Sequence, residues 1–476
     1  MSVPTYEKFR GDVLRFAERC GPGAGVFDEA EWEANGAGRV CDGKYKSCIV
    51  PPEKRQVRVL TLEERCRNNY WAFASTPGGV ESIEGSHSAV TTLFFLGELE
   101  KLSADNRTAW VDYFNRFQDP DTGYFAGPYI PPADHRSWRN PGDCTHTWIH
   151  LHDHMVSSLC SVISVLGGKS KIPLSRGRMT GRFLDRSCLR DYLWGRDWND
   201  YARDGNYRRH NPWYVGNEFW FPACILWQIT RWEAGTPAAI QARKMLDEVW
   251  YDWHDRNFGV NGFWYGDLDG APELLWRGNL KAGHHPAVPA TADERYWLAS
   301  AVMGGAHQLW FYNFDGHPIP DPVRRAQTDS MLALQNRHNR HFGMGDIDNP
   351  KGWSCNCTDI DCMTVLCMNF CNQDYRRDDC LRALHDSALA VLGERINADG
   401  VLQSTVGVPF SHAFNSVPTY SPADAGNMLD QSFYLWGVIA ACEVLEGSDD
   451  PGLATFINRR WPQMPANFLW VPRHSS

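Results

Sequence analysis

The sequence lacks the features that mark nucleic-acid-binding and membrane-spanning proteins. It has no run of five or more basic residues, and its 47 Lys and Arg against 57 Asp and Glu give a formal net charge of −10. A chain of this charge does not suit a phosphate backbone, so we expect no nucleic-acid partner. The longest apolar stretch, FYLWGVIAACEVL, is too short to cross a bilayer, so we expect no membrane span.

Signals for a metal, a nucleotide or secretion are missing as well. The 15 cysteines include no C-x-x-C pair, and the chain has no Walker loop, dinucleotide glycine fingerprint, G-x-S-x-G elbow or D-D-x-x-D. We therefore expect no cofactor. A diphosphate substrate would favour Mg²⁺ and a basic rim, and Arg208 and Arg209 are weak candidates for that rim. The charged N-terminus predicts a cytoplasmic protein with mostly reduced thiols. A secreted disulfide framework stays open, because Cys41 and Cys48 flank a loop-like stretch.

Many segments of the sequence show helical periodicity. Apolar residues return every three or four positions in SHSAVTTLFFLGELEKL, EFWFPACILWQITRWEAG, DIDCMTVLCMNFC and MLDQSFYLWGVIAACEVLEG. Long connectors rich in Gly, Pro, Asn and Asp separate these segments. The pattern predicts an all-α fold, an (α/α) barrel or toroid of stacked helix pairs with long functional loops. We expect one toroid domain over 81–476 and an N-terminal extension over 1–80 that packs on it.

A weak internal repeat supports this fold. Four stretches place polar turn residues before a glycine and a bulky or apolar group, each after a helical segment: FQDPDTGYFAGP, WHDRNFGVNGFWYGD, LQNRHNRHFGMGD and RINADGVLQS. One repeated unit would close a ring. Ordinary helix-to-helix turns are the alternative interpretation, because the spacing between the copies is uneven.

These turns, together with an Asp-x-Asp that opens a helix, resemble the (α/α) toroids of class II terpene cyclases, squalene-cyclase-type enzymes and protein prenyltransferase β-subunits. The resemblance covers roughly residues 85–445. In the cyclases the middle aspartic acid of Asp-x-Asp-Asp-Thr-Ala donates the proton, so the resemblance implies Asp361 as the catalytic acid, with Asp359 as the first Asp. Cys362 and Met363 stand where the cyclase pattern has Asp and Thr. This departure puts cyclase chemistry in question.

We expect the two aspartates of CNCTDIDCMTVLCM to have different roles, because they occupy different positions at the helix start. Asp359 would cap free N–H groups at the helix start, while Asp361 would point across the cavity. Burial beside a second carboxylate would keep an acid protonated near neutral pH, as proton donation requires. Capping without any chemistry is the alternative.

Neighbouring helices supply a predicted substrate-binding wall. Asn217 and Glu218 lie among the aromatic residues of NPWYVGNEFWF, whose rings suit either a carbocation or a sugar ring. We assign substrate binding to these residues and to others on the expected helices and turns: Glu218, Asn217, Trp213, Trp220, His150, His154, Trp264 and Tyr434.

Histidines and further acids occur near other expected helix starts. His146, His150 and His154 recur at every fourth position, a spacing that favours hydrogen bonding to a polar substrate over metal ligation, because no H-E-x-x-H order is present. A solvated or satisfied histidine face fits equally well. Two more acidic sites lie near expected helix starts: Glu84, with His87 three residues later, and the pair Asp293 and Glu294. We interpret them as helix-capping residues, with catalysis as the alternative role.

Three functions follow from these features. The first is a class II terpene cyclase-like enzyme, an isomerase or lyase, in which Asp361 protonates an isoprenoid in an aromatic-lined cavity. The alternative is a carbohydrate-active toroid, a glycoside hydrolase, lyase or epimerase, that uses two carboxylates drawn from Asp359, Asp361, Glu218 and Asp293. The third is a noncatalytic toroid binding protein. Each implies a small-molecule partner, and the sequence does not fix the oligomeric state.

Overall fold

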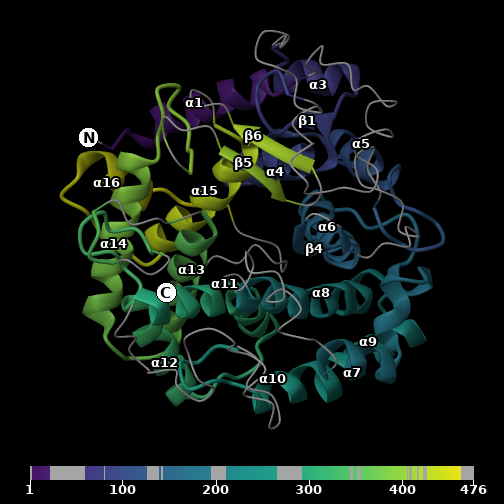
Figure 1. Cartoon of the computed structure of the whole chain (residues 1–476). Coiled ribbons are helices and arrows are strands. Elements are labelled where there is room, and N and C mark those ends of the chain that lie inside the picture. Colours follow the sequence, from purple (N-terminus) through teal and green to yellow (C-terminus); the bar gives the residue numbers. More distant parts are fainter. Residues whose placement is uncertain are drawn as a thin grey trace. The chain divides into compact units, whose positions relative to one another are not determined.

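The computed structural model describes residues 3–21, 59–79, 81–125, 139–140, 143–194, 211–264, 292–343, 347–350, 354, 356–404, 406, 410–414, 417–421 and 426–462. Helices dominate these residues, and the strands among them are short hairpins (Figure 1). The prediction of an all-α fold is confirmed. Within the described residues, no helix has both the length and the apolar character needed to span a membrane.

The chain forms two compact units. The first comprises residues 1–180, 392–435 and 450–465, and the second comprises residues 181–391, 436–449 and 466–476. The expected boundary at residue 80 falls inside the first unit, where Arg10 forms an ion pair with Glu98. The division into an extension and one toroid domain stays a prediction.

The first unit is built from helices and hairpins of both ends of the chain. Its helices are α1 (Tyr6–Arg19), α3 (Leu62–Asn68), α4 (Ile83–Phe95), η3 (Leu99–Lys101), α5 (Ala104–Asn115), α6 (Trp148–Val165), η4 (Leu174–Arg176) and α16 (Pro451–Ile457). Antiparallel pairs join β1 (Phe73–Ala74) to β2 (Glu81–Ser82), β3 (Arg139–Asn140) to β4 (Asp143–Thr147), and β5 (Phe410–Phe414) to β6 (Val417–Ser421).

Helices α1 and α16 join the two ends of the described chain within this unit. The Tyr6 N–H donates to Thr455 Oγ1 at 2.7 Å, and the Tyr6 ring meets the Phe456 ring edge-on at a centroid distance of 5.4 Å. Residues at the start of each helix favour its formation. Thr5 caps α1, and Asp450 followed by Pro451 opens α16, a favoured combination at a helix start.

The second unit contains the longest helices. They are α7 (Arg186–Trp194), α8 (Asn211–Trp232), α9 (Pro237–Met245), η7 (Leu246–Tyr251), α10 (Asp252–Arg256), α11 (Ala292–Asp315), α12 (Asp321–Leu332) and α13 (Asn356–Asn372). Helices η5 (Thr180–Leu184), α14 (Arg377–Glu394) and α15 (Met428–Cys442) contribute residues to both units. Helix α11 packs against both α8 and α13. Gly216 and Gly304 permit its close approach to α8, because a Cβ on Gly216 would lie 2.6 Å from Gly304 Cα.

The four stretches of the internal repeat share one turn geometry. Each turn begins with a backbone N–H that donates to a carbonyl four or five residues later, at 2.8–2.9 Å: Asp119 to Tyr124, Gly259 to Phe263, Asn336 to His341 and Asn397 to Val401. The residue before each acceptor has a positive φ, and the residue after it is buried. The turns connect α5 to α6, α10 to α11, α12 to α13 and α14 to α15. The repeat is therefore a real helix–turn–helix unit.

Glycine supplies the positive φ in three of these turns. Gly123, Gly262 and Gly400 take φ values of 78°, 83° and 79°, whereas Arg340 takes 64° in the remaining turn. A side chain in the left-handed region costs roughly 1–2 kcal/mol. At Gly262 a Cβ would also lie 2.5 Å from Gln327 Cγ, so two constraints select glycine there.

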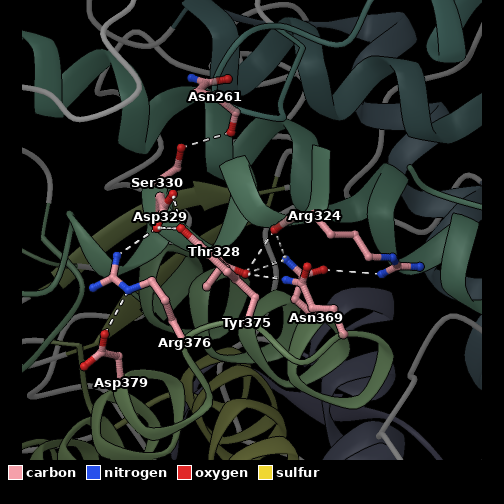
Figure 2. A network of polar contacts seen from close by, with 10 residues as sticks. Asn261, Arg324, Thr328, Asp329, Ser330, Asn369, Tyr375, Arg376 and Asp379 are labelled. Atoms are coloured by element: carbon pink, nitrogen blue, oxygen red, sulfur yellow. Dashed lines mark hydrogen bonds and ion pairs between the residues drawn. The ribbon is translucent and has the colours of Figure 1, made fainter. Parts of the chain in front are cut away.

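Polar contacts hold α12 to its neighbours (Figure 2). The Asn369 amide of α13 donates to the Arg324 carbonyl at 3.2 Å and to Thr328 Oγ1 at 3.3 Å, and it accepts from Arg324 Nη1 at 3.3 Å. Ser330 Oγ donates to the Asn261 carbonyl at 2.9 Å. These bonds satisfy polar groups that are buried at the C-terminal end of α13, far from its two aspartates.

A second part of this network fixes the connection between α13 and α14. The Asp329 carboxylate accepts from Tyr375 Oη at 3.0 Å and from Arg376 Nη1 at 2.8 Å. Arg376 Nε in turn donates to Asp379 Oδ2 at 2.8 Å (Figure 2). Charge-assisted hydrogen bonds therefore tie the connection between α13 and α14 to α12.

Candidate functional site

Asp359 anchors the turn that precedes its own helix. Its Oδ2 lies 3.0 Å from His341 Nδ1, and its Oδ1 accepts from the Phe342 backbone N–H at 2.8 Å. Asp359 is 0% exposed and His341 is 2% exposed. Buried polar groups need hydrogen-bond partners, and here the Asp359 carboxylate and the His341 imidazole bond to each other. The expectation that Asp359 caps its own helix is therefore wrong: α13 begins at Asn356, and both carboxylate oxygens bond to the turn.

Corresponding residues make the same anchor in two other turns. Tyr124, at the position of His341, donates its hydroxyl to Asp153 Oδ1 at 2.9 Å. Leu402, at the position of Phe342, donates its N–H to Gln431 Oε1 at 2.9 Å. Asp153, Asp359 and Gln431 thus occupy one position of the repeat. A role shared by three copies is a structural role.

Asp361 departs from this repeat. Two residues beyond the anchor, the other copies carry Met155 and Phe433, whereas α13 carries an aspartate. A helix turns by about 100° per residue, so Asp361 lies about 200° around α13 from Asp359 and faces away from the anchored turn. Its side chain is buried, with 1% exposure. A carboxylate is costly at such a position, and turn anchoring does not account for it.

A row of aromatic side chains lies beside α13 in the second unit, one helical turn after Asp361. Thr364, one helical turn after Asp361 on the same side of α13, accepts from Trp310 Nε1 at 2.8 Å. The Trp310 ring lies 4.5 Å from the Trp436 ring and 4.4 Å from the His307 ring. His307 lies 5.1 Å from Trp220. We call these four side chains, Trp220, His307, Trp310 and Trp436, the aromatic row.

Helix α8 carries two buried polar residues near Trp220 in the sequence: Asn217 lies one helical turn before it on the same side, whereas Glu218 lies about 200° around the helix from it. The Glu218 carbonyl accepts from Tyr192 Oη at 3.1 Å. The sequence therefore identified Trp220, Asn217, Glu218 and Asp361 on helices that border α11. The substrate-binding roles of Trp220, Asn217 and Glu218 and the catalytic role of Asp361 stay predictions.

The other predicted binding residues lie elsewhere. Trp264 is buried in the turn before α11 and donates its Nε1–H to the His254 carbonyl at 2.9 Å. His154 of α6 and Tyr434 of α15 are buried residues of the first unit. Trp213 and His150 lie on α8 and α6, but their side chains fall outside the described part of the structure.

Several weaker candidates also fall outside what the structure describes. These are the side chains of His146, Asp293 and Glu294, and residues Cys41, Cys48, Arg208 and Arg209. The cysteines whose side chains are described carry free thiols, and most of them are buried, as expected. Among described side chains, no group of three or more His, Cys, Asp or Glu is arranged to hold a metal ion.

Sequence reasoning missed His341, His307 and the Trp310–Thr364 bond. His341 is separated from Asp359 by 18 residues, and only the turn geometry brings them together. His307 and Trp310 lie on a long apolar helix, where nothing in the spacing separates them from core residues. The signal that could have found Asp361 is the comparison of the four repeat copies, since Asp361 replaces an apolar residue.

The chain matches no protein-family model, and comparison with the curated proteins gives no match.

Proposed function

We propose that this chain is a carbohydrate-active enzyme, a glycoside hydrolase, lyase or epimerase built as an (α/α) toroid, in which Asp361 is the acid or base. The observation that carries the proposal is Asp361 itself. It is a buried carboxylate at a repeat position that is otherwise apolar, next to a row of aromatic side chains interrupted by hydrogen-bonding groups.

The repeated unit supports the toroid. Four helix pairs follow one another along the chain through the same turn, and three of them use the same anchor. Repeated helix pairs bury a continuous core only by stacking on one another. An (α/α) toroid is the ring-shaped arrangement of such pairs.

Sugar chemistry fits the mixture of groups beside Asp361. Sugar rings bind to tryptophan faces while their hydroxyls bond to polar side chains, and the second unit offers Trp220, Trp310 and Trp436 next to His307. Glycoside hydrolysis requires a second carboxylate in most families, and Glu218 of α8 is proposed for that role because it is a buried candidate from the sequence and is not one of the three turn anchors. Both helices that carry these acids pack against α11.

Cyclisation of an isoprenoid is the second candidate, and one observation favours it. Trp310 and Trp436 pair closely beside the helix that carries Asp361, and aromatic faces stabilise carbocations through their quadrupoles. In this reaction Asp361 would protonate the substrate. The imidazole of His307 and the amide of Asn217 make the surroundings more polar than a hydrocarbon substrate needs, which places this candidate second.

The proposed setting is the cytoplasm, with a small molecule as the partner. Free thiols throughout the described cysteines support a reducing compartment. A diphosphate substrate would require Mg²⁺, whereas a sugar substrate requires no cofactor in most glycosidase mechanisms.

A turnover screen tests the proposal. Wild type and Asp361→Asn are incubated with two pools, one of oligosaccharides and uronides and one of isoprenoids and their diphosphates, and products are detected by mass spectrometry. We expect turnover in the sugar pool that falls by roughly 10²–10⁴-fold in Asp361→Asn, because the asparagine cannot transfer a proton. The matched control is Asp374→Asn, which changes an exposed carboxylate just after the same helix and should keep full turnover.

Each outcome decides between the candidates. Turnover of isoprenoids that depends on Asp361 would replace sugar chemistry with cyclisation. Equal sugar turnover in wild type and Asp361→Asn would remove Asp361 from the reaction. No turnover in either pool, with both proteins folded, would leave a binding protein.

A further inference from the structure

One side of α4 carries polar groups that the turn anchors do not explain. On the opposite side, Ser86 Oγ accepts from the Phe73 N–H at 2.9 Å and lies 3.2 Å from Tyr113 Oη. Ser86 therefore faces β1 and α5. Because each residue turns the helix by about 100°, Glu84 and Ser88 lie about 200° from Ser86, on the side turned away from both elements.

The polar atoms on this side have no hydrogen-bond partner among the described residues. Both carboxyl oxygens of Glu84, the hydroxyl of Ser88 and the hydroxyl of Thr92 are buried, and no described residue bonds to them. Glu84 is only 1% exposed. Buried polar groups are almost always bonded to protein, water or ligand, so a stripe of three groups that no described residue bonds to indicates an occupant outside the described part of the chain.

Burial favours the uncharged forms of Glu84 and His87 on this face. Burial raises the pKa of Glu84 well above its usual range and lowers the pKa of His87 to about 4. The elements packed against α4 bring other ionisable groups near: Glu81 of β2, Glu100 and Lys101 of η3, and His152, Asp153 and His154 of α6. Burial is the cause of the raised pKa of Glu84, and Glu81 and Asp153 already bond to Tyr70 and Tyr124.

We propose that this face of α4 is a binding site for a neutral polyhydroxylated compound, a sugar or sugar-like polyol, with Glu84, His87 and Ser88 as its hydrogen-bonding groups. A protonated carboxyl, a neutral imidazole and a hydroxyl can each donate and accept at once, as each hydroxyl of a sugar does. His87, one residue before Ser88, is the half-buried member of the set. A metal ion or an anion would find no compensating charge here.

The choice of a sugar as ligand rests on the proposed function, whereas the position of the site on α4 does not. Ordered water is the competing occupant, because water would satisfy the same atoms.

Binding is measured by isothermal titration of the full chain with methyl β-glucoside, cellobiose and chitobiose as neutral probes and glucuronate as the charged probe. We expect at least one neutral probe to bind and glucuronate to bind more weakly. Glu84→Leu and Ser88→Ala should each weaken binding by about tenfold or more, a loss of about 1.4 kcal/mol. Glu84→Gln keeps a donor and an acceptor and should bind nearly as wild type does.

Ser86→Ala is the matched control, because it removes a hydroxyl from the other side of the same helix. It should lower the melting temperature and leave the affinity unchanged. If Glu84→Leu does not fold, Ser88→Ala still tests the expected loss of affinity, and Glu84→Gln still tests whether a neutral donor and acceptor are sufficient. Binding by Glu84→Leu and Ser88→Ala at wild-type affinity, or no binding of any neutral probe to wild type, would overturn the inference and leave water as the occupant.

Asp361→Asn separates this inference from the proposed function. If it binds the neutral probe and loses turnover, both stand. If it keeps turnover while the α4 variants lose binding, the role of Asp361 fails and the α4 site stands. If turnover depends on Asp361 and the α4 variants bind normally, the role of Asp361 stands and the α4 site fails.

Discussion

At the scale of single residues, the Asp-Ile-Asp pair shows how one segment separates structure from chemistry. Asp359 bonds to His341 and to the Phe342 backbone, so its two oxygens are occupied by the turn. Asp361 faces the other side of α13, where Thr364 and Trp310 lie. The 200° between them follows from the helix itself. An alternating Asp-x-Asp at a helix start thus supplies one turn anchor and one buried carboxylate on the other side of the helix.

Loss of the anchor should destabilise the protein. Asp359→Ala removes the buried bonds to His341 Nδ1 and to the Phe342 N–H, and we expect a loss of about 2–5 kcal/mol in the free energy of unfolding. Gln431→Ala removes the corresponding anchor of another turn and should cost about 1–3 kcal/mol, because no ionisable partner is left behind. Urea and thermal unfolding measure both. A stability of Asp359→Ala equal to wild type would contradict the anchoring role.

At the scale of elements, the repeated turn explains which parts of the fold the sequence reveals. The helices were predictable because apolar periodicity is a local property, and the turns because glycine marks their left-handed residue. The anchors were not predictable, since one repeat position holds Asp153, Asp359 or Gln431, and their partners lie many residues upstream. The same distance in sequence hid the aromatic row, whose members come from α8, α11 and α15.

Arg340 offers a test of the turn geometry. It occupies the left-handed position that Gly123, Gly262 and Gly400 hold in the other copies. Its ion pair with Asp386 is long, at 3.8 Å, and half-exposed, so it contributes little. Arg340→Gly should therefore stabilise the protein by about 1 kcal/mol through relief of backbone strain.

Gly262→Ala is the opposite change at the matched position. The new Cβ would meet Gln327 and the Val323 carbonyl, so the loss should exceed the roughly 1–2 kcal/mol of backbone strain alone. Thermal unfolding of the two variants should shift in opposite directions. A shift in the same direction for both would show that the two turns are not equivalent.

At the scale of the whole molecule, buried neutral histidines set the response of stability to acid. Burial lowers the pKa of His254 to about 3 and that of His87 to about 4, from an ordinary value near 6.5. In the unfolded chain both titrate near 6.5. Their contribution to stability is therefore complete above pH 6.5 and is lost as the pH falls toward the folded values, by about 1.4 kcal/mol per pH unit for each histidine.

His254→Gln should reduce this acid sensitivity. Glutamine does not take up a proton, so the fall in melting temperature between pH 6.5 and pH 4.5 should be shallower than in wild type. The variant loses the contact between His254 Nδ1 and the Trp250 carbonyl, so its stability at pH 7.5 should be lower. Parallel pH profiles for wild type and variant would contradict the assignment of acid lability to this histidine.

The contact between α1 and α16 has a consequence for how the chain folds during synthesis. The first unit needs residues 1–180 together with 392–435 and 450–465, and Tyr6 meets its partner Thr455 only after that late segment has left the ribosome. Most of the second unit, residues 181–391, emerges earlier as one uninterrupted stretch. The middle of the chain can therefore fold as it emerges, whereas α1 gains its contact with α16 only once residues 450–465 have been synthesised.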